Sequence, residues 1–271
     1  MKTLVIINGI TGAVGTACLA EFSRVSEVTI FGLSRKGEHF SVFTKNGLLP
    51  NKTLICSIGD ITSKNDCVSF TKSINLSLYE KIIYIHAVGV YPFEIDSHGN
   101  IKVSHDEDGD GIDDRVVKLS YDAFFAMSNS LKETDKKIHA LILGGLSDKH
   151  RPAVHKSWWT VMEKVKNHMS ENISETKNID FFVLDISSII CPHELLTRPF
   201  VFQNTNANPR FWLMPHEVAE EIVKLTLPES KERFTEKDLF YKSDYYENNY
   251  FEGEKFTQRK REELGIETPE K

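Results

Sequence analysis

The chain has 271 residues, of which 40% are hydrophobic and 27% charged, and its formal net charge is −6. This size and composition predict one globular domain and exclude collagen-like, coiled-coil and wholly disordered chains. No run of 18 apolar residues occurs, which excludes a transmembrane helix, and no leader peptide is recognisable, so we expect a cytoplasmic protein. The four cysteines are too scattered for a disulfide framework, and the negative charge argues against nucleic acid or an anionic membrane as a partner.

Six short apolar runs predict strands, and segments with helical spacing lie between most of them. The expected strands are 4–7, 28–31, 53–56, 82–85, 140–143 and 181–184. The expected helices include 16–25, 64–78, 121–133 and 157–169. Continuous apolar runs are typical of strands that are buried on both faces of a parallel sheet. The alternation of strands and helices therefore predicts an α/β fold with a doubly wound parallel sheet.

A glycine-rich turn follows the first expected strand and opens the first expected helix. Its sequence is Asn8-Gly9-Ile10-Thr11-Gly12-Ala13-Val14-Gly15. In this context glycines allow a tight turn and let backbone N–H groups approach a pyrophosphate at the helix N-terminus. We expect a dinucleotide to bind Gly9, Thr11, Gly12, Val14 and Gly15; the alternative is a glycine-rich turn without a ligand.

The second expected strand leads into Ser34, Arg35 and Lys36. A site that prefers NAD usually carries Asp or Glu here, to bind the ribose 2′-hydroxyl. A guanidinium at this position can instead pair with a 2′-phosphate. Ser34 and Arg35 therefore favour NADP(H) over NAD(H), although Arg35 and Lys36 could also form an ordinary charged turn.

Three further motifs follow in chain order: Asp60-Ile61-Thr62, His86-Ala87-Val88-Gly89, and a late helix starting near Met214-Pro215. Together with the glycine spacing they resemble the short-chain dehydrogenase/reductase family, in its extended and atypical branches, over about residues 3 to 227. The resemblance implies a single Rossmann-fold domain that binds a nicotinamide dinucleotide. It also implies cofactor contacts from Asp60, Ile61, His86, Ala87 and Gly89.

The family's catalytic residues are a Ser at the end of the fifth strand and a Tyr-x-x-x-Lys pair on the following helix. Ser147 matches the serine, Lys164 matches the lysine that also holds the nicotinamide ribose, and Thr160 stands in the tyrosine position. A phenol can be tuned toward neutrality by a nearby ammonium, whereas an aliphatic hydroxyl is far too weak an acid. Ser120 lies near the position of the family's helix Asn, so a second part of the usual machinery also differs.

Three explanations of the missing tyrosine remain open. Another side chain could supply the proton, and the candidates are His155, His150, His86, Tyr91 and Tyr121. His155 precedes the helix and its imidazole titrates near neutrality, although a His there is also a common surface or capping residue. The second explanation is a non-redox reaction, such as a dehydration, isomerisation or cyclisation. The third is an inactive protein that binds NADP and regulates.

An acidic stretch interrupts the alternation after the fourth expected strand, over about residues 96–117. Within it, Asp106, Asp108, Asp110 and Asp114 have the spacing of a calcium loop of the EF-hand type, and Gly111 allows its sharp turn. Val117 stands where an EF-hand has its last Glu. The alternative is a solvated acidic turn that joins two strands, with 101–103 and 116–118 as its arms.

We expect a domain over residues 1–228 and a C-terminal extension over 229–271 that packs on this domain or is partly disordered. Trp158 and Trp159 immediately precede Thr160 and indicate a large apolar substrate pocket, helix packing or a contact with a second copy in a homodimer. The residues thus predict an NADP-dependent oxidoreductase acting on a small-molecule carbonyl or alcohol. The alternatives are the non-redox enzyme and the regulatory protein.

Overall fold

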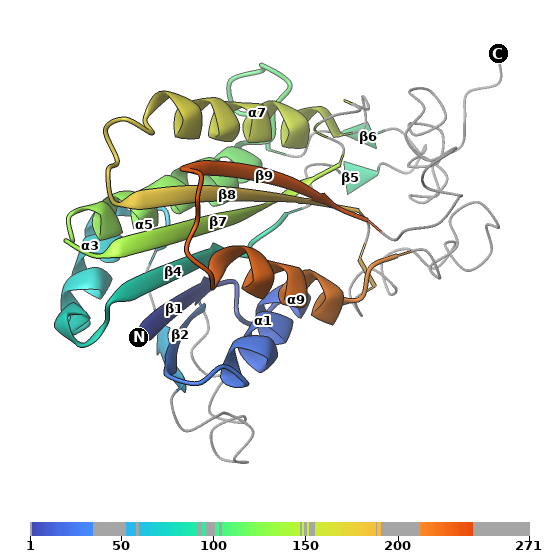
Figure 1. The fold of residues 1–271 in the computed structure, drawn as a ribbon. Helices are drawn as coiled ribbons and strands as arrows, with labels where there is room; N and C mark the ends of the chain where they lie inside the picture. The colour runs from blue at the N-terminus through green and yellow to red at the C-terminus, as the bar shows by residue number, and fades with distance from the viewer. Residues whose placement is uncertain are drawn as a thin grey trace.

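The protein is described from a computed structural model, which places residues 2–34, 53–57, 60–90, 94–95, 101–102, 105–146, 148, 151, 155–187, 189–190 and 212–240. Its centre is a seven-stranded sheet of order β3-β2-β1-β4-β7-β8-β9 (Figure 1). The strands are β1 (Thr3–Asn8), β2 (Val28–Ser34), β3 (Thr53–Ser57), β4 (Lys81–His86), β7 (Lys137–Gly145), β8 (Ile179–Ile186) and β9 (Phe234–Leu239). All neighbouring strands pair in parallel, which confirms the predicted fold class.

Helices cover both faces of this sheet. Those that the structure describes are α1 (Ala13–Ser23), α3 (Lys64–Ser73), η1 (Leu76–Leu78), α4 (Asp114–Val116), the π-helical η2 (Val117–Asp122), α5 (Ala123–Lys132), α7 (Lys156–Glu171) and α9 (Pro215–Thr226). In Figure 1, α1 and α9 lie on one side of the sheet, and α3, α5 and α7 lie on the other. None of the helices in the described part of the chain is long and apolar enough to cross a bilayer.

Two apolar clusters fill the spaces between the sheet and its helices. Side chains alternate along each strand, so successive residues of β1 serve opposite faces. Leu4 and Ile6 pack toward α3, α5 and α7, whereas Val5 and Ile7 pack toward α1 and α9. Because β1 has apolar layers on both sides, it is buried along its whole length. The two layers hold the carboxyl ends of the strands in one row, where ligands of such sheets bind.

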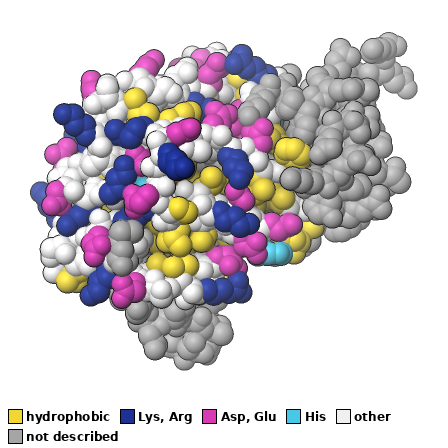
Figure 2. Space-filling model, in the orientation of Figure 1, with side chains coloured by type: hydrophobic (Ala, Val, Ile, Leu, Met, Phe, Trp, Pro, Cys, Tyr) yellow, Lys and Arg dark blue, Asp and Glu magenta, His cyan; other side chains and the backbone are white. Residues whose placement is uncertain are grey.

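The edge strand β9 belongs to the segment that we expected to be a C-terminal extension. It pairs in parallel with β8, and Asp185 lies opposite Asp238 in the register. Its sequence, FTEKDL, carries too many charges to be recognised as a buried strand, and its exposure confirms that it is only partly covered. Figure 2 shows charged side chains of both signs interspersed over the face that carries β9 and α9. Residues 241–271 lie outside the described part of the chain.

The acidic stretch does not join two strands, which corrects one of the two interpretations of this segment. The short strand β6 (Ile101–Lys102) pairs with β5 (Glu94–Ile95), and residues 116–118 are helical. Asp113 caps α4, because its side chain accepts a hydrogen bond from the N–H of Arg115. The acidic loop therefore leads directly into the helical stretch that ends at Lys132.

Candidate functional site

The glycine turn lies between β1 and α1, beside the carboxyl end of β4. Gly9 has a φ of 81°, in the left-handed region, and a Cβ there would lie 2.6 Å from the carbonyl oxygen of Ala87. A Cβ on Gly15 would lie 2.2 Å from the carbonyl oxygen of Gly9, so only glycine lets α1 approach β1 this closely. Gly12 is the N-cap of α1, and its N–H donates to Gly9.

This turn occupies a topological switch point of the sheet. From β1 the chain continues to β2 on one side, and β4 pairs on the other side. Open α/β sheets bind their ligands at such points, outside the carboxyl ends of the strands. The first turn of α1 also leaves backbone N–H groups without intrahelical partners, and the helix dipole adds partial positive charge. The turn therefore has the features that a pyrophosphate requires.

Two predicted cofactor residues in this turn have different surroundings. Thr11 is exposed at the tip of the turn. The Val14 side chain is 5% exposed and packs in the core against α9, so only its backbone faces the carboxyl end of the sheet.

The next predicted residues follow β2 and β3. Asp60 is exposed, and its Oδ1 accepts hydrogen bonds from the N–H and the hydroxyl of Thr62, at 2.8 and 2.7 Å. Ile61 is buried, so only its backbone is accessible. Ser34 is the last residue of β2, and Arg35 lies outside the described residues. The structure therefore leaves Asp60 available to a nucleotide and does not describe the residue that we expect at the 2′-phosphate.

His86 ends β4, but its ring points into the core and is fully buried. Its Nε2 lies 2.7 Å from the Leu119 carbonyl oxygen, and because a carbonyl can only accept, Nε2 carries the hydrogen. Nδ1 then accepts from the Asn8 amide at 3.0 Å and from the Tyr84 hydroxyl at 2.9 Å. Burial lowers the pKa of His86 to about 4, although the bond to Leu119 opposes this. His86 is thus a neutral core residue, which removes it from the candidate proton donors.

Backbone after His86 continues the same edge of the sheet. The N–H of Ala87 donates to the carbonyl oxygen of Asn8 at 3.0 Å, which holds the segment against the glycine turn. Gly89 is exposed, and a Cβ there would meet no atom within 4 Å. Ala87 therefore borders the glycine turn, and Gly89 is exposed two residues further on.

The π-helical turn η2 faces the end of β4. The wider turn of a π-helix frees carbonyls from the regular α-helical pattern, and such turns are common at functional sites. Here the Leu119 carbonyl accepts from His86, as described above. Next to it, Ser120 is buried, and its hydroxyl has no hydrogen-bond partner among the described residues. The sequence predicted a helix only from residue 121, so neither the earlier start nor the π-helical turn was expected.

Thr160 and Lys164 lie one turn apart on α7 and share a side of the helix. Lys164 is exposed. Thr160 is half-buried, and its hydroxyl oxygen is buried without a hydrogen-bond partner among the described residues. His155 occupies the N-cap position of this helix, but its side chain makes no capping hydrogen bond to the first turn. Three candidates, Ser147, His150 and Tyr91, lie outside the described residues.

The two tryptophans beside Thr160 have different surroundings. Trp158 is half-buried and packs against both the core and the cluster of Ile112, Val116 and Val161. The guanidinium carbon of Arg151 lies 5.5 Å from the centroid of the Trp159 ring. Trp158 therefore packs against neighbouring elements, as the helix-packing alternative predicts.

A buried charged cluster, which sequence reasoning missed, lies at the carboxyl ends of β7 and β8. Lys166 of α7 places its Nζ 2.9 Å from Asp185 Oδ2, 3.1 Å from Asp148 Oδ2 and 3.2 Å from Glu236 Oε1. The side chain of Asp185 is fully buried and that of Asp148 is 6% exposed. The available signal was Asp185 itself, a lone carboxylate in the apolar run FFVLDI.

Burial sets the protonation of this cluster. It raises the pKa of Asp185, the negative charge of Asp148 raises it further, and the Lys166 ammonium only partly opposes both effects. Burial likewise raises the pKa of Asp148 against the influence of Lys166. For Lys166, burial alone would lower the pKa, but Asp148 and Asp185 outweigh it and hold the pKa above its usual value. The cluster therefore combines a lysine that stays positively charged with two carboxyl groups whose pKa values burial raises.

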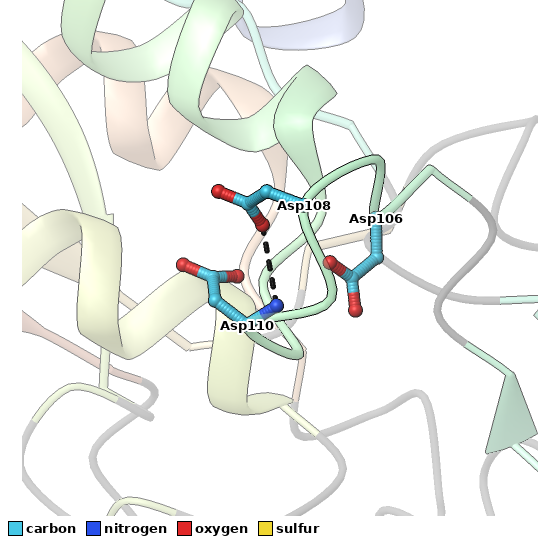
Figure 3. Close-up of side chains that lie close together, drawn as sticks. All are labelled: Asp106, Asp108 and Asp110. Carbon is cyan, nitrogen blue, oxygen red and sulfur yellow. Dashed lines mark hydrogen bonds between the residues drawn. The ribbon is translucent and has the colours of Figure 1, made fainter.

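The acidic loop brings three of its predicted ligands together. One carboxylate oxygen from each of Asp106, Asp108 and Asp110 lies within 4.8 Å of the other two (Figure 3). Asp106 accepts from the N–H groups of Gly109 and Gly111, at 2.8 and 2.9 Å. Thus the loop is already folded around its own carboxylates.

Asp114, the fourth predicted ligand, closes the same loop. Its Oδ2 accepts from the N–H of Glu107 at 3.0 Å, and its own N–H donates to the carbonyl of His105. The loop also contacts the start of α7, where the N–H of Asp113 donates to the hydroxyl of Ser157 and Lys156 Nζ lies 3.3 Å from the carbonyl oxygen of Asp110.

Comparison with known proteins adds evidence at the level of the fold. No protein-family profile matches this sequence, and no curated protein matches it. Solved structures do match. Serine dehydrogenase from Escherichia coli superimposes with a TM-score of 0.64 at 10% identity, covering 88% of this chain and 97% of that one. A short-chain dehydrogenase/reductase of glucose/ribitol dehydrogenase type from Brucella melitensis gives 0.62 at 16% identity, covering 88% and 95%.

A third match was solved with a nucleotide. It is an alcohol dehydrogenase from Thermococcus sibiricus in complex with 5-hydroxy-NADP, with a TM-score of 0.61, 14% identity, and coverage of 89% of this chain and 97% of that one. At these identities the likeness concerns the fold alone. The chain therefore has the fold of the short-chain dehydrogenases/reductases, which confirms that part of the resemblance.

Proposed function

We propose that this protein is an NADP-dependent oxidoreductase acting on a small-molecule carbonyl or alcohol. The observation that carries the proposal is the glycine turn at the switch point between β1 and β4, on a chain with the short-chain dehydrogenase/reductase fold. Bound NADP(H) would supply or accept a hydride. Gly9, Gly12 and the first turn of α1 would hold its pyrophosphate, and Asp60 would bind the adenine end.

The preference for NADP is supported by the sequence after β2. Ser34 and Arg35 stand where an acidic residue would repel a 2′-phosphate, and a guanidinium pairs with phosphate. Lys164 is exposed on α7 and would bind the nicotinamide ribose. Ser147 would orient the substrate oxygen.

A second candidate function is favoured by Thr160. Its hydroxyl replaces the family's acid and is buried without a partner among the described residues. This favours a non-redox reaction, or regulation without turnover, if no other group supplies a proton. In both of these alternatives the protein binds the nucleotide. The non-redox enzyme converts a substrate, whereas the regulatory protein does not.

A nucleotide titration tests the proposal. Purified protein is titrated with NADPH, NADP⁺ and NADH while nicotinamide fluorescence is followed, and NADPH oxidation is then measured with a panel of aldehydes and ketones. We expect NADPH to bind more tightly than NADH and at least one carbonyl to be reduced. Arg35→Asp should reverse the nucleotide preference. Absence of binding by either nucleotide would refute the proposal, and binding without turnover would favour the second candidate.

Lys164→Met provides the matched test on α7. We expect it to weaken NADPH binding at least tenfold without changing the thermal midpoint, because Lys164 is exposed. Lys177→Met, also exposed, is the control and should bind NADPH normally. Equal binding by both variants would show that Lys164 is not the ribose-binding lysine.

Cation binding by the acidic loop remains a prediction. The convergence of Asp106, Asp108 and Asp110 supports a structural calcium site.

A further inference from the structure

Helix α7 carries Lys164, and two side-chain hydrogen bonds hold this helix against the helical stretch formed by α4 and η2. Near the start of α7, the hydroxyl of Ser157 accepts from the N–H of Asp113 at 3.0 Å. Near its end, Nδ1 of His168 lies 2.9 Å from the hydroxyl of Tyr121. Either of these last two groups can donate, so the contact does not depend on the tautomer of the imidazole. Lys164 therefore lies along the helix between two fixed points, which we call the α7 contacts.

The first α7 contact is enclosed by other side chains. Asp113 is fully buried, and Ser157 is buried beside it. The carboxylate of Asp113 accepts from the backbone N–H of Arg115 at 2.9 Å and from its Nη2 at 2.8 Å, which fixes the residue that donates to Ser157. One turn further along α7, Val161 belongs to the same apolar cluster as Ile112. Because a buried N–H that loses its acceptor costs free energy, the hydroxyl of Ser157 is held firmly in this position.

Aromatic rings surround the second α7 contact. The ring centroids of Tyr121 and His168 are 5.5 Å apart, and the ring of Phe125 lies 4.9 Å from the first and 4.2 Å from the second. Removal of the Tyr121 hydroxyl alone would therefore leave the packing of these rings in place. This hydroxyl, one of the candidate proton donors, is thus engaged between two helices.

The helical stretch that receives both α7 contacts is itself bonded to the strand beside the glycine turn. Leu119 lies in η2, two residues before Tyr121, and its carbonyl accepts from His86 at 2.7 Å. Nδ1 of His86 accepts in turn from the amide of Asn8, the residue before Gly9, at 3.0 Å. The His86 ring is fully buried, so both bonds lie within the packed core. Hydrogen bonds and short backbone segments therefore connect the glycine turn to α7 without a break.

A dinucleotide that binds both the glycine turn and Lys164 has to span the separation between them. Its pyrophosphate and its nicotinamide ribose are joined covalently, and a protein that already holds the two sites at the matching distance loses less free energy on binding. We propose, on the basis of the proposed function, that the two α7 contacts set this separation and that Ser157 and Tyr121 are positioning residues for the nicotinamide half of NADP(H). Neither residue touches the nucleotide. Both act through Lys164, which they hold within reach of the ribose.

The first test follows hydrogen–deuterium exchange along α7 and needs no ligand. Ser157→Ala should speed exchange near the start of the helix and Tyr121→Phe near its end, by about tenfold each, since loss of one hydrogen bond lowers the free energy of local opening. Ser128→Ala and Tyr79→Phe are the controls and should leave α7 unchanged. Ser128 is buried and its hydroxyl has no partner among the described residues, and Tyr79 precedes β4 at the amino end of the sheet. Unchanged exchange in Ser157→Ala and Tyr121→Phe would overturn the proposal.

The second test compares two ligands that share the adenine end. NADPH reaches both the glycine turn and Lys164, whereas adenosine 2′,5′-bisphosphate lacks the nicotinamide half. We expect Ser157→Ala and Tyr121→Phe to weaken NADPH binding by about three- to tenfold, the size of one lost hydrogen bond, and to leave the bisphosphate within about twofold. A general loss of structure would weaken both ligands alike. Equal weakening of the two ligands, or no weakening of either, would overturn the proposal while the proposed function stands.

A double-mutant cycle shows whether the α7 contacts act through Lys164. Tyr121→Phe should weaken NADPH binding in the unsubstituted protein and have almost no effect in Lys164→Met, because the interaction that it positions is then already absent. Additive effects of the two substitutions would overturn the positioning role. If Ser157→Ala fails to fold, Tyr121→Phe still carries each test, because it removes one oxygen from a ring that stays packed. Failure of the unsubstituted protein to bind NADPH would overturn both this role and the proposed function.

Discussion

The Nε2 of His86 donates to the carbonyl oxygen of Leu119 at 2.7 Å, which joins the end of β4 to the π-helical turn of the neighbouring helix. Because the ring nitrogens also bond Asn8 and Tyr84, the imidazole is fully engaged in its neutral form. This bond fixes the spacing between the strand that borders the glycine turn and the helical stretch beside α7. If His86 were protonated, Nδ1 would carry a hydrogen that points at the Asn8 amide and the Tyr84 hydroxyl, which both donate to Nδ1 in the neutral form.

This arrangement predicts a loss of stability in mild acid. The pKa of His86 is about 4 in the folded protein, below the value near 6.5 expected when unfolded. Its contribution to stability is therefore complete above pH 6.5 and is lost as the pH falls toward 4. Urea denaturation between pH 7 and pH 4.5 should show this, and His86→Gln should have a shallower pH dependence. Some dependence should remain, because burial also lowers the pKa of His139.

The control for this experiment is His216→Gln, since His216 is exposed on α9. It should keep the pH dependence of the unsubstituted protein. If His86→Gln and His216→Gln behave alike, His86 is not the group that makes the protein sensitive to acid.

Alanine in place of Gly15 should destabilise the protein. A Cβ there would lie 2.2 Å from the Gly9 carbonyl oxygen and 2.7 Å from the Cα of Ile10, both of which are backbone atoms. Such overpacking costs about 1–3 kcal/mol. Gly12→Ala is the matched comparison, because its nearest contact is 3.2 Å. Thermal denaturation should show a much larger drop for Gly15→Ala, and equal midpoints would contradict the close approach of α1 and β1.

Lys166→Met should lower stability most at alkaline pH. Loss of one partner of a buried ion pair costs on the order of 3 kcal/mol when the remaining charge is uncompensated. Protonation of Asp148 and Asp185 relieves this at lower pH, so the loss should grow as the pH rises. Urea denaturation near pH 6 and pH 8.5 measures the difference. Lys224→Met, whose side chain is 66% exposed, should cost about 0–1 kcal/mol at both.

Calcium binding gives the fourth prediction. If the acidic loop holds calcium, the thermal midpoint should rise on its addition and fall with EDTA, because a ligand that binds only the folded state stabilises it. Asp108→Asn combined with Asp110→Asn should abolish the response. Isothermal calorimetry gives the stoichiometry, and no heat of binding in the unsubstituted protein would refute the site. In that case, the hydrogen bonds between the carboxylates of the loop and its own backbone N–H groups would hold the loop in this geometry without a cation.

The sequence predicted the sheet well because its strands are continuous apolar runs. All six expected strands occur, and the structure extends each of them by one or more residues. The seventh, β9, was missed because alternating charges hide a strand whose pairing with β8 is decided by tertiary packing. The glycine turn could be predicted because its positions follow from backbone geometry, as Gly9 and Gly15 show.

The candidate site was less predictable, because burial and long-range contacts decide it. His86 occupies a motif position, yet its ring faces the core through bonds to Asn8 and Leu119 that no local pattern reveals. The cluster of Asp148, Asp185, Lys166 and Glu236 draws on three elements and one connecting segment. Only Asp185, a charge within an apolar strand, was visible in the sequence. Its partners depend on which face each element turns inward.

Strand β9 has a further consequence for how copies of this protein meet. It ends the sheet in the described part of the chain, so one row of its backbone groups lies at an open edge. Unprotected edges of this kind template the addition of strands from other molecules, and charged side chains oppose such pairing. Glu236, Lys237 and Asp238 lie in succession along this edge, and Lys237 is tied to Glu221 of α9. Glu236, which also binds Lys166 of the buried cluster, and its charged neighbours thus make this edge a poor starting point for aggregation.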